Sequence, residues 1–249
     1  MLEEYHLERD PLCVLYELLG LGFLECSHMD RNGKKRWKMG APLYLNSLNQ
    51  FVNILLEVIM KIYLIRHGHA DHNLGFRTHG EKAYSSTEYY NSALTELGHE
   101  QTISVGEKFE GRIPVDRIYC SPLKRCIESA RNIFGVKKIL YLWDGLVETK
   151  GPYPCNHRPP VEEIRASYQR VNLENVSPDW NNLEPLEDWR DGTEGLIALK
   201  KRATRCFEAI SAEAQADGLE AIAIVTHCDW IYAIIGTKIK NAEVVAIES

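Results

Sequence analysis

The chain has 249 residues, which is enough for one sizeable domain or for one domain with an appended segment. Hydrophobic residues make up 45% of it and charged residues 26%, a balance that is typical of a soluble globular protein. The formal net charge is −6, which argues against direct binding of nucleic acid, because proteins that bind nucleic acid are more often basic.

Cysteine usage and apolar runs indicate where the protein works. The seven cysteines are odd in number and contain no C-x-x-C pair, which favours free thiols in a reducing compartment. The longest apolar run, residues 51–60, contains Asn53 and Glu57 and is too short to span a bilayer. The first residues are acidic, unlike those of a secretory signal. We expect a cytoplasmic protein, with the nucleus as the second candidate location, and no membrane partner.

The sequence is expected to consist of two parts. Residues 1–59 form an N-terminal extension, in which the apolar run after Asp10 and Pro11 predicts one short helix. Met60 starts "MKIYLIRHG", a natural beginning for a separate domain that covers residues 60–249. We hypothesise that the extension is an appended segment, or else an artefact of how the coding sequence was assembled. Detection of peptides from upstream of Met60 in the native protein would exclude the artefact.

From Met60 onward, predicted strands and helices alternate. Thr95 is placed as the N-cap of one helix, and Ser121, followed by Pro122, as the N-cap of the next. Residues 151–194 are rich in Pro, Asn and Trp and are predicted to be irregular. Further helices are expected at 194–218 and 228–236, and apolar runs predict strands at 61–65, 115–120, 138–148 (running into a loop), 221–226 and 242–248.

This alternation predicts an α/β fold with three layers, in which a mainly parallel sheet carries helices on both faces. In such sheets ligands bind beyond the carboxyl ends of the strands. Four separate segments deliver polar residues to that edge. They are Arg66 with His67, the turn at 121–125, Glu148 and His227.

The stretch "IRHGHADHN" at residues 65–73 suits two chemistries. The run from His67 to His72 fits the zinc pattern H-x-H-x-D-H, whereas Arg66-His67-Gly68 fits a phosphate site. A dinuclear zinc hydrolase needs further ligands downstream, including a histidine in a Gly-rich turn, and the later histidines do not supply that pattern. The predicted alternation also disagrees with the β-sandwich of such enzymes. A zinc hydrolase is therefore disfavoured, and we expect no metal and no other cofactor.

The phosphate interpretation explains more residues. A phosphoryl group carries about two negative charges, which the guanidinium forks of Arg66 and Arg125 suit. Arg125 is predicted in the first turn of a helix, where the dipole also favours an anion. A neutral His67 can attack phosphorus, and a protonated His227 would add charge to the developing oxygens. Glu148 can protonate the departing alcohol and later take a proton from water.

The motifs carry a resemblance to a known family. They are "RHG" at 66–68, "LTELGHEQ" at 94–101, "SPLKRCIESA" at 121–130, "LVE" at 146–148 and "VTH" at 225–227. In this order and spacing they resemble the histidine phosphatase superfamily, the phosphoglycerate-mutase-like group, over about residues 60–249. The passage from "GPYPCNHRPP" to "NAEVVAIE" is similar to a eukaryotic phosphoglycerate-mutase-like branch.

The resemblance implies a role for each matching residue. His67 would be the phosphorylated nucleophile, with Arg66, Arg125 and His227 around the phosphate and Glu148 as proton donor. Asn73 would add a supporting polar contact to the substrate. The sequence departs from the family pattern in three places. Ser92 and Ala93 replace the usual aspartate before "LT", which concerns substrate preference. Cys228 replaces a small residue, although its backbone N–H can still point at phosphate, and Asn156 replaces an aspartate, which concerns substrate preference.

Three functions remain open on this basis. We favour a phosphomonoester phosphatase acting on a small phosphorylated substrate or a phosphopeptide, because only 79 positions separate Glu148 from His227 and mutases carry longer covering segments. The alternatives are a phosphoglycerate-type mutase and a non-catalytic interaction subunit of a larger assembly. A homodimer is a further candidate. His157 and Arg158 are predicted at the site entrance, where they could contact a second anionic group of the substrate.

Overall fold

The computed structural model describes residues 24–29, 35–39, 60–109, 114–178 and 194–248. The chain divides into two compact units, Met1–Val58 and Ile59–Ser249. In the first unit, strand β1 (Leu24–Met29) pairs antiparallel with β2 (Lys35–Met39), a pairing that the sequence did not suggest. The helix predicted after Pro11 lies outside the described residues.

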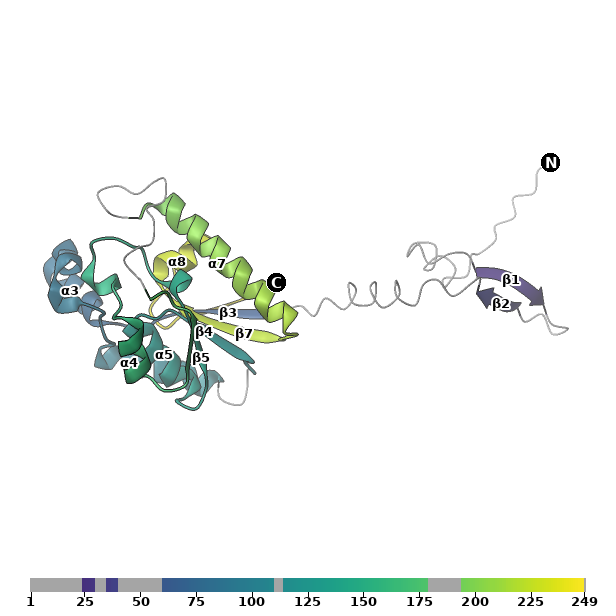
Figure 1. Ribbon diagram of the computed structural model, residues 1–249, viewed down its shortest axis with the longest axis horizontal. Helices are drawn as coiled ribbons and strands as arrows, with labels where there is room; N and C mark the ends of the chain where they lie inside the picture. Colours follow the sequence, from purple (N-terminus) through teal and green to yellow (C-terminus); the bar gives the residue numbers. More distant parts are fainter. Residues whose placement is uncertain (1–23, 30–34, 40–59, 110–113, 179–193, 249) are drawn as a thin grey trace. The chain divides into compact units, whose positions relative to one another are not determined.

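The second unit is built on a six-stranded sheet with the order β6-β5-β4-β7-β3-β8 (Figure 1). Neighbouring strands run parallel except β8, which pairs antiparallel with β3 at one edge. Every residue of the central strand β7 is buried, as expected for a parallel strand covered on both faces. The strands are β3 (Lys61–Arg66), β4 (Arg117–Cys120), β5 (Leu140–Trp143), β6 (Val171–Asn175), β7 (Ala221–Thr226) and β8 (Val244–Glu248).

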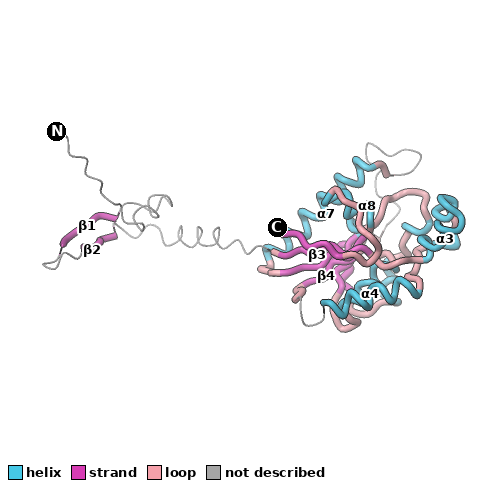
Figure 2. Tube along the Cα trace, turned by 180° about the vertical axis from the view of Figure 1, so that it is seen from behind, coloured by secondary structure: helices cyan, strands magenta, loops and turns pink. Residues whose placement is uncertain are grey.

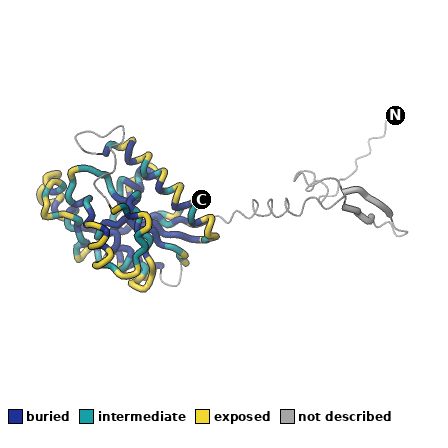
Figure 3. The backbone as a smooth tube through the Cα atoms, viewed as in Figure 1, coloured by how far each residue is buried: buried dark blue, intermediate teal, exposed yellow. Residues whose placement is uncertain are grey.

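Helices cover both faces of this sheet, which confirms the predicted three layers (Figures 1 and 2). Alternate residues of β7 separate the two cores, since Ala223 and Val225 pack with α4 and α5 whereas Ile222 and Ile224 pack with α7 and α8. The buried strands form the centre of the unit (Figure 3). The helices are α3 (Asp71–His79), α4 (Glu96–Phe109), α5 (Lys124–Phe134), α6 (Val161–Ser167), α7 (Leu196–Ala216) and α8 (Cys228–Ile235).

Three features of the second unit differ from the predictions. Helix α5 begins at Lys124 with Leu123 as its N-cap, and the Ser121 hydroxyl, predicted to be the cap, instead contacts His227 at 2.8 Å and the Leu123 backbone N–H at 3.4 Å. Helix α3 begins shortly after β3 and was not predicted, because its first turn has few apolar residues and its N-cap residue, Ala70, has no capping side chain. The region predicted to be irregular contains α6, β6 and the short 3₁₀ turn η4 (Pro154–Asn156).

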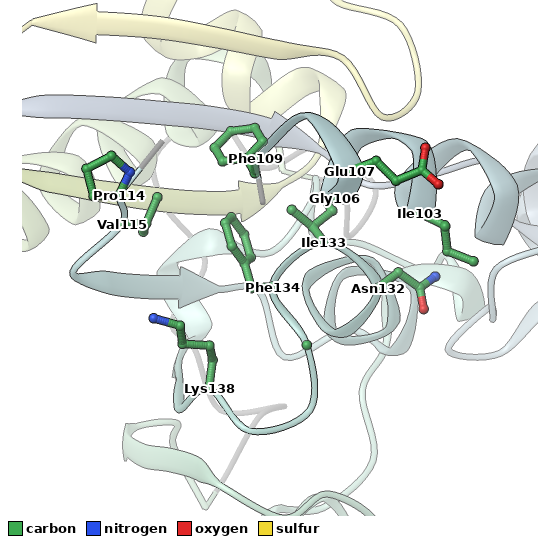
Figure 4. Close-up of a pocket in the computed structure, with 11 residues that line it drawn as sticks. Ile103, Gly106, Glu107, Phe109, Pro114, Val115, Asn132, Ile133, Phe134 and Lys138 are labelled. Atoms are coloured by element: carbon green, nitrogen blue, oxygen red, sulfur yellow. The ribbon is translucent and has the colours of Figure 1, made fainter. Parts of the chain in front are cut away.

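A cavity of about 770 Å³ lies between α4 and α5, near the start of β4 and therefore at the opposite end of the sheet from the strand carboxyl ends (Figure 4). Its lining is largely apolar, with Glu107 and Lys138 as its charged residues. It therefore lacks the group of polar side chains that catalysis would need.

Among the described residues no helix is long and apolar enough to cross a membrane.

Candidate active site

Residues from three strand ends converge beyond the carboxyl edge of the sheet. His67 follows β3, His227 follows β7, and Arg125 lies in the first turn of α5, which follows β4. The Nε atom of Arg125 is 3.3 Å from Nε2 of His67, and its Nη2 atom is 3.2 Å from Nδ1 of His227. The two imidazole centroids are 5.2 Å apart. The sequence therefore identified groups that the fold brings into direct contact.

Two glycines let the loop that carries His67 approach helix α4. A Cβ atom on Gly68 would lie 2.5 Å from the carbonyl oxygen of Gly98, and a Cβ on Gly98 would lie 2.0 Å from that of His69. The backbone N–H of Gly68 donates to the Ser129 hydroxyl at 3.0 Å, and this hydroxyl donates to the Arg125 carbonyl at 2.6 Å. The loop that carries His67 is thus tied to the helix that carries Arg125.

The protonation of His67 follows from its neighbours. Its Nδ1 atom lies 2.7 Å from the Gly68 carbonyl, which can only accept, so Nδ1 carries the proton and Nε2 carries the lone pair. Burial lowers the pKa of His67 well below its usual value, and the positive charges of Arg125 and Arg66 act in the same direction. His67 is therefore a neutral imidazole whose basic nitrogen faces the Arg125 guanidinium, as a nucleophile requires.

The guanidinium of Arg125 is fully buried and is held on several sides. Besides the two histidines, it donates to the carbonyl of Cys155 at 2.6 Å and to Oδ1 of Asn156 at 3.0 Å. Asn156 in turn donates to the Thr149 carbonyl at 2.8 Å. The turn η4 therefore orients Arg125, a role that sequence reasoning did not assign to Asn156 because it regarded this position only as a determinant of substrate preference.

His227 is the N-cap of α8 and is fully buried. Its Nδ1 atom faces the Arg125 donor, so Nε2 carries the proton and donates to the Ser121 hydroxyl at 2.8 Å. Burial and the Arg125 charge lower the pKa of His227 well below its usual value. The structure thus favours a neutral hydrogen-bonding His227 over the additional cation considered from the sequence.

Glu148 lies after the 3₁₀ turn η3 (Asp144–Leu146), which follows β5. Burial raises the pKa of Glu148 to about 7; the Asp229 charge adds to this, while Arg125, the Asp229 backbone N–H and Arg66 oppose it. The segment is fixed by Arg202, whose guanidinium donates to the carbonyls of Val147 at 2.9 Å and Glu148 at 3.1 Å. A carboxyl group in this environment can hold and release a proton near neutral pH.

The remaining predicted site residues lie around this centre. Arg66 donates through Nη1 to the Ile239 carbonyl at 2.7 Å, and its charge acts on both His67 and Glu148. Asn73 is in α3, and its Oδ1 atom accepts from the Ala70 backbone N–H at 3.0 Å. Cys228 opens α8, and burial raises the pKa of its partly exposed thiol, which therefore stays protonated at neutral pH.

Two sequence-based ideas are not supported. Arg158 is buried and forms an ion pair with Asp144, with donor–acceptor distances of 2.8 and 2.9 Å, so its guanidinium cannot receive a substrate anion as predicted. The neighbouring His157 lies 2.8 Å from the Gly151 carbonyl. In the described part of the chain, no three His, Cys, Asp or Glu side chains are arranged to hold a metal ion, and His69 instead contacts Thr95.

Comparisons with known proteins agree with this geometry. The sequence pattern of the Histidine phosphatase superfamily (branch 1) matches residues 62–244. A "Phosphoglycerate mutase-like protein" of Arabidopsis thaliana is 23% identical over 72% of this chain and 75% of its own length. A broad-specificity phosphatase of Saccharomyces cerevisiae is 24% identical over 68% of this chain and 66% of its own length.

The fold is shared with solved structures. A phosphoglycerate mutase from Bacillus anthracis superposes with a TM-score of 0.54, covering 77% of this chain and 88% of the mutase at 20% identity. The likeness at this identity concerns the fold, whose mainly parallel sheet with helices on both faces is the one found here.

Proposed function

Because the chain belongs to the histidine phosphatase superfamily (branch 1), we propose that it hydrolyses a phosphomonoester through a phosphohistidine intermediate on His67. The observation that carries the proposal is the pairing of His67 with Arg125. The basic Nε2 nitrogen of a neutral buried imidazole lies 3.3 Å from a guanidinium donor. A nucleophile and a group that can bind phosphate are therefore side by side.

In the first step, the His67 lone pair attacks phosphorus and forms a P–N bond while the P–O bond to the alcohol breaks. The departing oxygen takes the proton that Glu148 holds, and the alcohol leaves neutral. A pKa of about 7, raised mainly by burial, gives Glu148 a substantial protonated fraction at neutral pH. The guanidinium of Arg125 would exchange its contact with His67 for contacts with the phosphoryl oxygens.

In the second step, water attacks phosphorus and the P–N bond breaks. The Glu148 carboxylate, now unprotonated, takes a proton from the water, and the lone pair returns to Nε2 of His67. Inorganic phosphate leaves and the starting protonation states are restored. Through both steps Arg66 and Arg125 balance the phosphoryl charge, and neutral His227 accepts a hydrogen bond from Arg125 and so orients its guanidinium.

Hydrolysis is preferred to a mutase reaction because the connection between Glu148 and His227 is short, so water has easier access to the intermediate. The yeast relative carries the name of a broad-specificity phosphatase, which supports the same choice. The substrate would be a small phosphorylated molecule or a phosphopeptide. A role only as an interaction subunit is the alternative that an activity assay distinguishes.

The test is hydrolysis of p-nitrophenyl phosphate at about pH 6 by the wild type and by a His67→Ala variant, with trapping of the phosphoenzyme. We expect turnover by the wild type, loss of turnover in the variant, and a phosphoryl label that is stable in alkali and lost in acid. Equal and negligible turnover by both proteins would contradict the proposal and favour an interaction subunit. Transfer of phosphate to an added alcohol in preference to water would favour a mutase.

A further inference from the structure

A third imidazole stands beside the nucleophile. His72 lies in the first turn of α3 and is a buried residue, with a relative exposure of 6%. Its ring centroid is 5.9 Å from that of His67. The ring centroid of Tyr84 is 6.2 Å from that of His72. Sequence reasoning weighed His72 only as a zinc ligand, and the mechanism above does not use it.

The hydrogen bonds around His72 determine which ring nitrogen carries its proton. The backbone N–H of Ala70 needs an acceptor and finds Oδ1 of Asn73 at 3.0 Å, which fixes the orientation of the Asn73 amide. The Nδ2 group of Asn73, a donor, then lies 3.1 Å from Nε2 of His72. Nε2 is therefore the acceptor nitrogen, and the proton of a neutral His72 is on Nδ1.

This Nδ1–H group has no acceptor in the described part of the chain, although it is shielded from solvent. The Nε group of Arg66 is a second buried donor in the same condition. A buried donor without a partner is destabilising, and such groups are rare in folded proteins unless they serve a function. The described residues offer Nδ1 no acceptor, and an oxyanion bound beside His67 and Arg66 would supply one.

The electrostatic surroundings keep this donor neutral. Burial lowers the pKa of His72 well below its usual value, and the charges of Arg125 and Arg66 act in the same direction. The ring therefore carries one proton across the range in which His67 is a free base. A neutral donor beside two guanidinium groups suits an oxyanion, because it adds a hydrogen bond without adding a further buried cation.

We propose that the Nδ1–H group of His72 donates a hydrogen bond to a phosphoryl oxygen of the bound substrate, which makes His72 an additional binding residue of the active site. The inference rests on the proposed function for the identity of the oxyanion. It also assigns Asn73 a task, which is to hold the His72 ring in the donor tautomer.

The experiment compares His72→Phe with His72→Asn. Phenylalanine keeps a ring between His67 and Tyr84 but removes the donor, whereas the asparagine amide can place an N–H group near the position of Nδ1. The control is His79→Phe, an exposed histidine in the last turn of the same helix. Two quantities are measured for each variant: kcat/KM with p-nitrophenyl phosphate, and the affinity for orthovanadate by titration calorimetry.

We expect His72→Phe to lower kcat/KM about 100-fold, the usual effect of removing one donor to a developing oxyanion, and to weaken orthovanadate binding in parallel. His72→Asn should recover at least roughly tenfold of that loss, and His79→Phe should match the wild type. Thermal unfolding of each variant shows whether the fold is retained. If His72 had only a structural role, the substitutions would change the melting temperature, and asparagine would not restore the affinity for orthovanadate.

The outcomes separate this inference from the proposed function. Wild-type kcat/KM and orthovanadate affinity in His72→Phe would overturn the role of His72 and leave the phosphatase proposal intact. A wild-type protein without turnover that nevertheless binds orthovanadate in a His72-dependent manner would overturn the phosphatase proposal and support His72 as an oxyanion ligand. Equal losses in the phenylalanine and asparagine variants would also refute the donor role.

Discussion

The alkaline limit of activity should depend on a carboxylate that does not touch the substrate. Asp229 lies in the first turn of α8, and its charge is the largest contribution after burial to the raised pKa of Glu148. The substitution Asp229→Asn removes this charge but keeps the backbone N–H that binds Glu148. It also removes an exposed ion pair with Lys238 at 3.1 Å, which contributes little to stability.

The size and sign of the effect follow from the protonation that catalysis needs. Glu148 must be protonated to assist the departing alcohol, so kcat/KM falls as pH rises through its pKa of about 7, compared with 4.5 for an ordinary glutamate. Burial supplies the larger share of that elevation, and we assign roughly one pH unit to Asp229. The variant should therefore lose activity about tenfold well above neutrality and keep wild-type activity near pH 5.

The assay is a pH profile of kcat/KM for the wild type and the variant with glycerol phosphate, an alkyl ester whose alcohol must be protonated as it leaves. The control is Asp217→Asn, which removes an equal charge at the opposite end of the sheet, where Asp217 pairs with Arg117 at 2.7 Å. An alkaline limb of Asp229→Asn that coincides with the wild type, or moves to higher pH, would refute the assignment of Glu148 as the proton donor tuned by Asp229.

Two further substitutions test other parts of the site. Arg125→Lys keeps one charge, but a lysine cannot contact His67, Asn156 and His227 together. We therefore expect kcat/KM to fall by about 10²- to 10³-fold in the steady-state assay. A decrease under threefold would contradict the role of the guanidinium fork. Arg158→Met leaves the Asp144 carboxylate buried without its partner and should lower the free energy of unfolding by about 3 kcal/mol in urea titrations. The KM for a substrate that carries a second anionic group should not change. A raised KM would instead show that Arg158 binds the substrate.

The sequence predicted the strands that are apolar runs but not β6, whose sequence VNLEN is largely polar. It also predicted where polar residues gather, because parallel strands end at one edge. It could not predict the start of α5, since Ser121 and Pro122 form a good start signal until His227 is known to contact Ser121. Helix α3 was also missed, because its apolar pattern is weak and its N-cap is the unremarkable Ala70.

The roles of polar residues were harder to predict where they depend on contacts between distant segments. Arg158 looks in sequence like a free cation close to the site motifs, and only the fold shows that Asp144, fourteen positions earlier, neutralises it. His72 is ambiguous for the same reason. Its neighbours in sequence suggest a metal ligand, whereas the donor role proposed above depends on the orientation of the Asn73 amide, which no spacing reveals.

The charge of the site follows from burial. The rings of His72 and His227 both lie beside that of His67, and protonating all three beside Arg66 and Arg125 would concentrate five positive charges in a largely buried site. Burial and the two arginines instead lower the pKa of each imidazole, so the guanidinium groups alone supply the positive charge. Their two charges match those of a phosphoryl dianion. A neutral ring suits each proposed task, which is attack on phosphorus for His67, donation to a phosphoryl oxygen for His72 and acceptance of the Arg125 hydrogen bond for His227.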